Sequence, residues 1–141
     1  MIVVDLNVLI YAVDENSFHH AAAKSWLEGQ LNGTENIGIP WIVILGFLRI
    51  MTNGKVFPHP LTEDQAVEII DAWIKHPLVR IPHPKENHWH LMKELIAESG
   101  TAGNLTSDIH LAAIAMQHGL KLFTLDADFS RFKGLRWERP F

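Results

Sequence analysis

The sequence predicts an α/β fold in which a four- to five-stranded, mainly parallel sheet is flanked by helices. Short β-branched or aromatic runs recur along the chain, and apolar stripes at helical spacing separate them. The chain has 141 residues, the common size of a single domain, and 48% of them are hydrophobic, which is enough to bury a core. We therefore expect one domain over residues 1–141.

Five segments have the composition of strands. The clearest are Ile2–Val4, which ends on Asp5, and Lys121–Leu125, which ends on Asp126. The weaker candidates are residues 37–39, residues 78–81 and an edge strand in the tail at residues 134–138. Because strands alternate with helices, we expect parallel pairing with both faces of the sheet covered.

Helical segments fill the intervals between these strands. We expect helices from residue 18 to about 29, and over residues 41–51, 62–76, 86–99 and 106–118. Thr62 and Gln65 form a capping-box pattern, and Gly119 has the position that ends the last helix. The segment 41–51 is apolar nearly all round, which indicates a buried helix with Arg49 as its one charge.

Composition excludes several classes of protein. The chain has no cysteine, which excludes a disulfide framework, cysteine zinc sites and thiol catalysis. The longest apolar run, Trp41–Leu48, is far shorter than the roughly 20 residues that cross a membrane. The N-terminus has no secretory signal, so we expect a cytoplasmic protein without membrane contact.

The net charge of −4 does not fit a non-specific nucleic-acid binder. The basic residues are nevertheless concentrated near the end of the chain, where Arg131, Lys133, Arg136 and Arg139 lie within nine positions. A solvated surface segment is the simpler interpretation of this cluster.

Four acids lie where an α/β sheet binds ligands, beyond the carboxyl ends of its strands. Asp5 ends the first strand, Asp126 and Asp128 follow the late strand, and Asp108 lies in the first turn of the helix before it. Converging carboxylates repel each other, and hard oxygen ligands favour Mg²⁺ or Mn²⁺. Such a site can lower the pKa of a bound water and support phosphodiester hydrolysis.

Each acid also has a structural interpretation. Asp108 could satisfy a helix N-terminus, and the segment Asp126–Asp128 could be a turn. An acid at the end of a buried strand has few structural uses, so a functional role is the favoured interpretation of Asp5.

Three segments carry a resemblance to a known family: Met1–Ile10, Ser107–Ala115 and Phe123–Phe129. In order, spacing and total length they resemble the PIN-domain family, and more narrowly the VapC-type toxins of type II toxin–antitoxin modules. The stretch from Pro40 to Arg49 is similar to a subset of those toxins. The resemblance covers essentially the whole chain.

This resemblance implies a PIN-like fold and a Mg²⁺-dependent ribonuclease, with Mn²⁺ as a substitute. It also implies a homodimer, an RNA substrate and a cognate VapB-type antitoxin that holds the toxin inactive. The family's metal-binding acids match Asp5, Asp108 and Asp126, and Asp128 matches a frequent additional acid. Asn7 and Thr124 fall where small polar residues line the site, and Thr124 could orient a carboxylate or a water.

One departure from the family is substantial. Most relatives place a glutamate on the helix that corresponds to residues 41–51, whereas this chain has no acid between Glu35 and Glu63. We expect Ile44 or a near neighbour to fill that position. The departure supports an alternative function, a catalytically weak or inactive module that binds RNA or protein without cutting.

Arg49 has two open interpretations. It contacts RNA phosphate or the site acids, or it pairs with a buried carboxylate, since an unpaired buried arginine would be costly.

Two other active sites are less well supported. The residues His83, His88 and His90 could suggest zinc, but positions two apart on a helix point to different faces. The strand-terminal acid is similar to that of haloacid-dehalogenase-type phosphatases, which have Asp-x-Asp where this chain has Asp5-Leu6-Asn7.

The large aromatic residues exceed what one small core needs. They include Phe18, Trp26, Phe47, Phe57 and Trp73, and we expect some of them to line a dimer or antitoxin groove.

Overall fold

The computed structural model describes residues 1–141 and contains one five-stranded sheet. The strands are β1 (Ile2–Val4), β2 (Ile37–Gly38), β3 (Val79–Arg80), β4 (Lys121–Phe123) and β5 (Trp137–Glu138). Their order is β3-β2-β1-β4-β5, and every neighbouring pair is parallel. The expected α/β class and the edge strand in the tail are confirmed.

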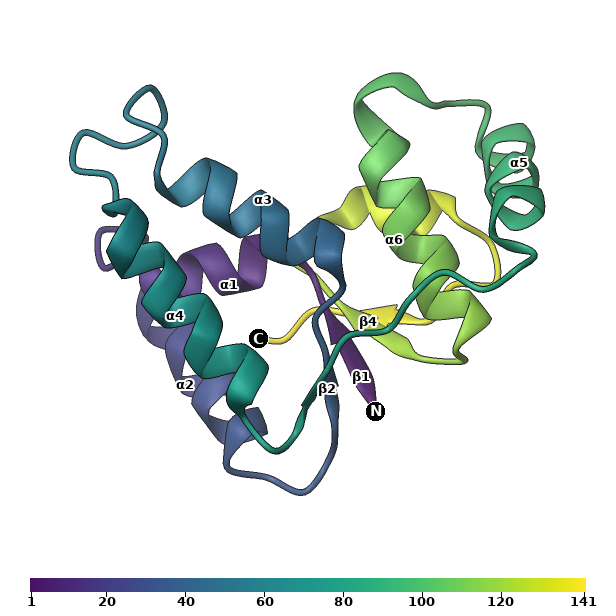
Figure 1. The fold of residues 1–141 in the computed structure, drawn as a ribbon. Helices are drawn as coiled ribbons and strands as arrows, with labels where there is room; N and C mark the ends of the chain where they lie inside the picture. The colour runs from purple at the N-terminus through teal and green to yellow at the C-terminus, as the bar shows by residue number, and fades with distance from the viewer.

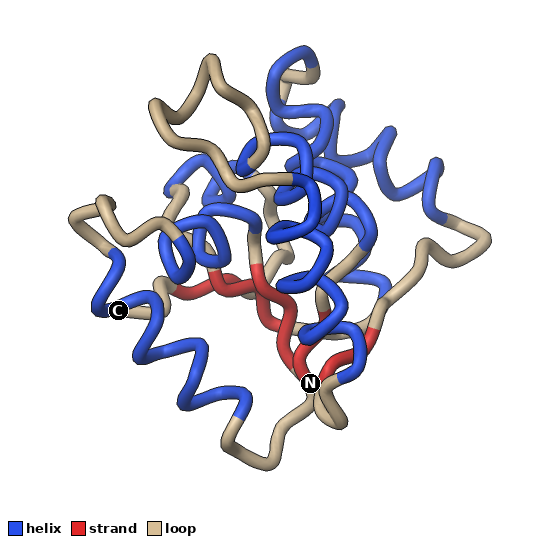
Figure 2. The backbone as a smooth tube through the Cα atoms, turned by 60° about the vertical axis from the view of Figure 1, so that its left-hand side comes forward, coloured by secondary structure: helices blue, strands red, loops and turns tan.

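Six α-helices and two short 3₁₀ segments surround the sheet. They are α1 (Leu6–Val13), α2 (His20–Leu31), α3 (Trp41–Met51), α4 (Glu63–Lys75), α5 (His88–Ser99), η1 (Gly103–Leu105), α6 (Thr106–Gln117) and η2 (Ala127–Arg131). Figure 1 shows α1 to α4 grouped on one side of the central strands and α5 with α6 on the other. Figure 2 shows the strands enclosed by helices, as a parallel sheet requires. None of the helices combines the length and the apolar composition that crossing a bilayer requires.

The hydrophobic core lies between these layers. β1 is buried along its whole length, and 29 buried hydrophobic residues form a single cluster. On the α3 side of the core, the ring of Phe47 is fully buried and meets the ring of Trp73 edge to face at 4.8 Å. Phe47 therefore belongs wholly to the core, whereas Trp73 packs against it and keeps 8% of its surface exposed.

Several helix boundaries agree with the sequence. Thr62 caps α4, and its capping box with Gln65 is complete in both directions. Gly100 ends α5, and Gly119 follows α6, both at positive φ, which a residue with a side chain rarely adopts.

Three expectations about the helices were wrong. Helix α1 was not predicted, because its β-branched and large apolar residues continue the pattern of β1. Helix α2 begins at His20 rather than Phe18, whose side chain is 97% exposed. Helix α3 has the predicted bounds but is only half buried, since Trp41, Leu45 and Arg49 form an exposed stripe along it.

The topology determines where the site lies. The strand order reverses between β1 and β4, because β2 and β3 continue to one side and β5 to the other. Ligands of parallel sheets bind beyond the strand ends at this switch point. Asp5 directly follows β1, and the segment containing Asp126 follows β4.

Candidate active site

Asp5 is the buried centre of the site. Its side chain is 7% exposed, and it caps α1, with Oδ1 accepting a hydrogen bond of 2.7 Å from the backbone N–H of Leu6. Oδ2 accepts hydrogen bonds from Thr124 Oγ1 at 2.7 Å and from Asn7 Nδ2 at 3.0 Å. Asp5 therefore also has a structural role as the N-cap of α1, a helix that was not predicted from the sequence.

Thr124 joins the two strand ends. Its hydroxyl donates to Asp5, and the oxygen accepts from the backbone N–H of Asp126 at 3.0 Å and from Asn7 Nδ2 at 3.2 Å. Thr124 is fully buried, so it cannot contact a substrate, and the expectation that it binds substrate is corrected. Its other expected role, orientation of a carboxylate, is present in the structure.

Asn7 completes this network. Besides its two donations, its Oδ1 accepts from the backbone N–H of Leu125 at 3.2 Å. Its amide is thus engaged with protein groups on both sides and holds α1 against the end of β4, while the residue stays partly exposed.

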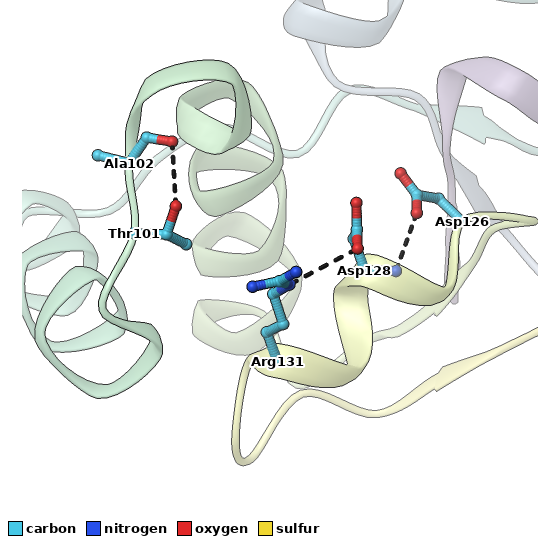
Figure 3. A network of polar contacts seen from close by, with 5 residues as sticks. All are labelled: Thr101, Ala102, Asp126, Asp128 and Arg131. Carbon is cyan, nitrogen blue, oxygen red and sulfur yellow. Dashed lines mark hydrogen bonds and ion pairs between the residues drawn. The ribbon is translucent and has the colours of Figure 1, made fainter.

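Asp126 and Asp128 lie at the start of the segment after β4, where Asp126 caps η2 and Asp128 lies within it. Asp126 Oδ1 accepts from the backbone N–H of Asp128 at 2.8 Å, so the local turn anticipated from the sequence exists. Asp128 is exposed, and its Oδ1 lies 3.6 Å from Arg131 Nε. Figure 3 shows both contacts and the two carboxylates projecting from the same segment.

Asp108 brings a carboxylate from α6. The start of α6 has no side-chain cap, and the Asp108 side chain makes no hydrogen bond, so capping does not explain it. Burial, with smaller contributions from the negative charges of Asp5, Asp126 and Asp128, raises the pKa of Asp108 to about 6. Burial is also the main reason that the pKa of Asp5 is raised, with a smaller contribution from Asp126. The four predicted acids therefore share one electrostatic environment.

A small cleft of about 80 Å³ opens beside Asp5 and Asp108. On the α3 side its wall consists of Ile42, Val43, Gly46 and Arg49. No acid faces the cleft from α3, and the near neighbours of Ile44, among them Val43 and Gly46, form the wall where relatives are expected to place a glutamate. Arg49 is exposed and has no carboxylate within ion-pair distance, so its pairing with a buried carboxylate was a wrong interpretation.

The histidines belong to the packing of α5 on α6. His88 Nε2 and His110 Nδ1 share a hydrogen bond of 2.8 Å, and His88 Nδ1 contacts Gln117 Oε1 at 2.8 Å. His90 points elsewhere, to Glu94 at 3.1 Å. His88 and His90 therefore lie on different faces of α5, as their spacing predicts.

The donors at this site fit a hard divalent cation. Asp108 has both carboxylate oxygens free of hydrogen bonds, Asp126 has Oδ2 free, and mutual repulsion disfavours ionisation of the group without a counter-charge. No three acidic or histidine side chains are arranged as a finished metal cage. The chemistry of the donor set thus suits Mg²⁺ or Mn²⁺.

Neutralising Asp108 is expected to stabilise the metal-free protein at high pH. Because the folded-state pKa is raised from 3.8 to about 6, folding is most favoured by this group below pH 3.8, and that contribution is lost as the pH rises through 6. Asp108→Asn should raise the free energy of unfolding at pH 8 by about 1 kcal/mol, discounted for partial exposure, or about 3 °C in Tm. The gain should vanish at pH 4.

Thermal denaturation in EDTA at both pH values tests this expectation. The matched control is Asp71→Asn, at an exposed position on α4. A variant of Asp108 that is no more stable than wild type at pH 8 would show that burial and the neighbouring carboxylates do not oppose its charge as described.

The family model for the PIN domain matches residues 2–135. Ribonuclease VapC37 of Mycobacterium tuberculosis is 37% identical over 140 residues, covering 99% of this chain and 97% of the relative. Ribonuclease VapC33 of the same species is 34% identical over 140 residues, covering 99% of this chain and 98% of the relative.

Solved structures share the fold at lower identity. VapBC2 from Rickettsia felis, bound to a promoter DNA fragment, matches with a TM-score of 0.73 at 20% identity, covering 99% of this chain and 98% of that one. VapC20 of Mycobacterium tuberculosis, described as a sarcin–ricin loop cleaving toxin, matches with a TM-score of 0.69 at 16% identity, covering 96% and 99%. With a matching family model, full-length relatives and the acids at the β1/β4 switch point, the chain belongs to the PIN-domain family and groups there with the VapC proteins.

Proposed function

We propose that this protein is a divalent-metal-dependent ribonuclease that acts as the toxin of a toxin–antitoxin pair. The observation that carries the proposal is the shared electrostatic environment of Asp5, Asp108, Asp126 and Asp128, which come from three separate parts of the chain. A fold gains nothing from bringing repelling carboxylates together, so the cost indicates a cation site. The names of the full-length relatives, Ribonuclease VapC37 and Ribonuclease VapC33, support RNA as the substrate.

In this proposal Asp5, Asp108 and Asp126 hold Mg²⁺ or Mn²⁺, and Asp128 assists. When bound, such an ion supplies an activated water and offsets the negative charge that develops on a phosphodiester in the transition state. The other residues prepare the carboxylates. Thr124 and Asn7 fix the orientation of the Asp5 carboxylate through their hydrogen bonds to its Oδ2.

Arg49 is proposed to bind a phosphate of the substrate. It lies on the wall of the same cleft as Asp5 and Asp108, and it has no carboxylate partner of its own. A guanidinium can donate two parallel hydrogen bonds to a phosphate, and this makes it a suitable counter-charge where α3 offers no acid.

We propose a VapB-type antitoxin as the protein partner, bound in an apolar groove of about 230 Å³ between α1, α2 and α4. The groove is lined by Ala12, Val13, Leu27, Leu31, Ile69 and Trp73, with Lys24 and Glu28 at its rim. Such a surface suits the apolar face of an amphipathic helix. The likeness to VapBC2 from Rickettsia felis supports a partner of this kind.

We also propose a homodimer that buries the two apolar residues of the exposed α3 stripe, Trp41 at 45% and Leu45 at 56% exposed, and leaves Arg49 open to the cleft. Because the proposed substrate is intracellular RNA, we propose that the protein acts in the cytoplasm.

RNA cleavage by the purified, antitoxin-free protein tests the proposed function. Total cellular RNA is incubated with Mg²⁺ or Mn²⁺, with EDTA, and with EDTA followed by excess Mg²⁺. We expect discrete cleavage products that EDTA abolishes and added Mg²⁺ restores. A folded protein that cuts no RNA with either metal would instead favour a PIN-like module that binds RNA or protein without cutting.

A further inference from the structure

The cluster of basic residues near the C-terminus divides between two edges of the sheet. Arg136 donates to the backbone carbonyl of Gly119, just before β4 begins, and it shares a surface hollow with Met1. Arg131 and Arg139 lie at the opposite edge, where the strands end and the acids gather. Residues that form one cluster in the sequence therefore lie at two separate edges of the sheet in the fold.

Arg131 borders the acidic site directly. It ends η2, and its Nε lies 3.6 Å from Asp128 Oδ1, while both side chains are about half exposed at 53% and 49%. Figure 3 shows its guanidinium turned toward Asp128, beside the segment that carries Asp126. A single exposed contact of this length is worth little, so the other guanidinium donors are free for a ligand.

Arg139 reaches the same edge from another element. Because β5 runs parallel to β4, the chain leaves β5 at the end of the sheet where the acids lie. Nη1 of Arg139 donates a long hydrogen bond of 3.4 Å to the carbonyl of Leu125, the residue before Asp126. Arg139 is exposed and has no carboxylate within ion-pair distance.

The two arginines contact residues on either side of Asp126 in the sequence. Arg139 touches the residue before it, and Arg131 touches Asp128, two residues after it. A polyanion approaching this edge meets repelling carboxylates on a protein whose net charge is −4. Binding therefore requires local cations next to the acids, and an arginine guanidinium can donate two parallel hydrogen bonds to a phosphate.

We propose that Arg131 and Arg139 bind the RNA phosphates that neighbour the one presented to the aspartates. This inference rests on the proposed ribonuclease function and extends it, because it makes the substrate a strand held over several consecutive phosphates. Arg136 takes no part, although it has the same chemistry and comes from the same nine residues.

The test measures how RNA affinity depends on salt. Binding of a labelled single-stranded RNA to the Asp5→Asn protein with Mg²⁺ is followed by fluorescence anisotropy from about 50 to 200 mM salt. Each of Arg131→Gln and Arg139→Gln should weaken binding about threefold to tenfold at about 100 mM salt. Each should also reduce the slope of log affinity against log salt by about 0.7, the value expected when the protein neutralises one phosphate fewer on a single strand.

Two further variants separate charge from structure. Arg131→Lys should keep most of the slope because it keeps the charge, and Arg136→Gln should match the parent protein throughout. Circular dichroism melts verify that each variant is folded. The inference is overturned if the Arg131 and Arg139 variants bind as Arg136→Gln does while the wild type still cleaves RNA. A wild type that neither binds nor cuts RNA would overturn the proposed function as well.

Discussion

Asp5→Asn is expected to reduce RNA cleavage by at least about a thousandfold, which corresponds to roughly 4 kcal/mol of transition-state stabilisation. The Asp5 carboxylate is the one charged group at the end of β1, and it forms the floor of the proposed metal site. An amide of the same shape carries no negative charge, so it is a weaker ligand for a divalent cation than a carboxylate is. Growth inhibition by the expressed protein should disappear together with cleavage.

The same variant should remain folded. Burial raises the pKa of Asp5, so its charge opposes folding at neutral pH, and removing the charge offsets the loss of hydrogen bonds. One unfavourable contact remains in the variant. The Nδ2 group that replaces a carboxylate oxygen is a donor, and it meets another donor, either Asn7 Nδ2 or the backbone N–H of Leu6. We expect Tm to change by no more than a few degrees.

Asp14→Asn is the matched control. Asp14 lies at the other end of α1, where its Oδ1 accepts a hydrogen bond from the backbone N–H of Asn16, which an asparagine can also accept. The control should cleave RNA as the wild type does. Wild-type activity in a folded Asp5→Asn protein would refute a mechanism centred on the carboxylates.

Local signals in the sequence predict much of the fold. The capping box of Thr62 and Gln65 identifies the start of α4, and the glycine after α6 identifies its end. The ends of β1 and β4 place Asp5 and Asp126 together because parallel strands that pair share one edge. These predictions need only neighbouring residues and one topological rule.

Helix α1 and the exposed stripe of α3 were not predicted, because their local sequence patterns fit more than one structure. The residues of α1 are as apolar and β-branched as a strand, and the signal for a helix is Asp5, whose carboxylate serves as cap and proposed ligand at once. The exposed stripe of α3 cannot be seen in its composition, because Trp41 and Leu45 are as apolar as its buried residues. Which face packs is decided by the neighbouring helices.

The electrostatics of the site also depend on residues that are distant in the sequence. Asp108 is separated from Asp5 by most of the chain, yet the negative charge of Asp5 helps to raise the pKa of Asp108 in the folded state. The position of Gly46 on the cleft wall likewise follows from the rotation of α3 against α1, which residue spacing alone leaves open. A Cβ at Gly46 would lie 2.7 Å from Leu6 Cδ2, so even a small side chain there requires the Leu6 side chain to shift.

Thr124→Val should produce the largest effect of any residue that lies outside the cleft itself. Valine keeps the shape of threonine and loses the hydroxyl, which donates to Asp5 at 2.7 Å and accepts from the backbone N–H of Asp126 at 3.0 Å. Both groups then lose a hydrogen bond in a largely buried place, which should lower the free energy of unfolding by about 1–3 kcal/mol. Cleavage should fall about tenfold to a hundredfold, because the Asp5 carboxylate is no longer held in one orientation.

The pH dependence separates this positioning role from a loss of stability. The Thr124 hydroxyl lowers the pKa of Asp5 by stabilising the carboxylate, so its removal raises that pKa further. A carboxylate that ionises at higher pH moves the acidic limb of the Mg²⁺-dependent rate profile toward higher pH. Thr124→Ser, which keeps the hydroxyl and loses only a methyl group, should leave the limb where it is in the wild type. If the valine and serine variants have the same profile, packing of the methyl group rather than the hydroxyl explains why a threonine lies between the two strand ends.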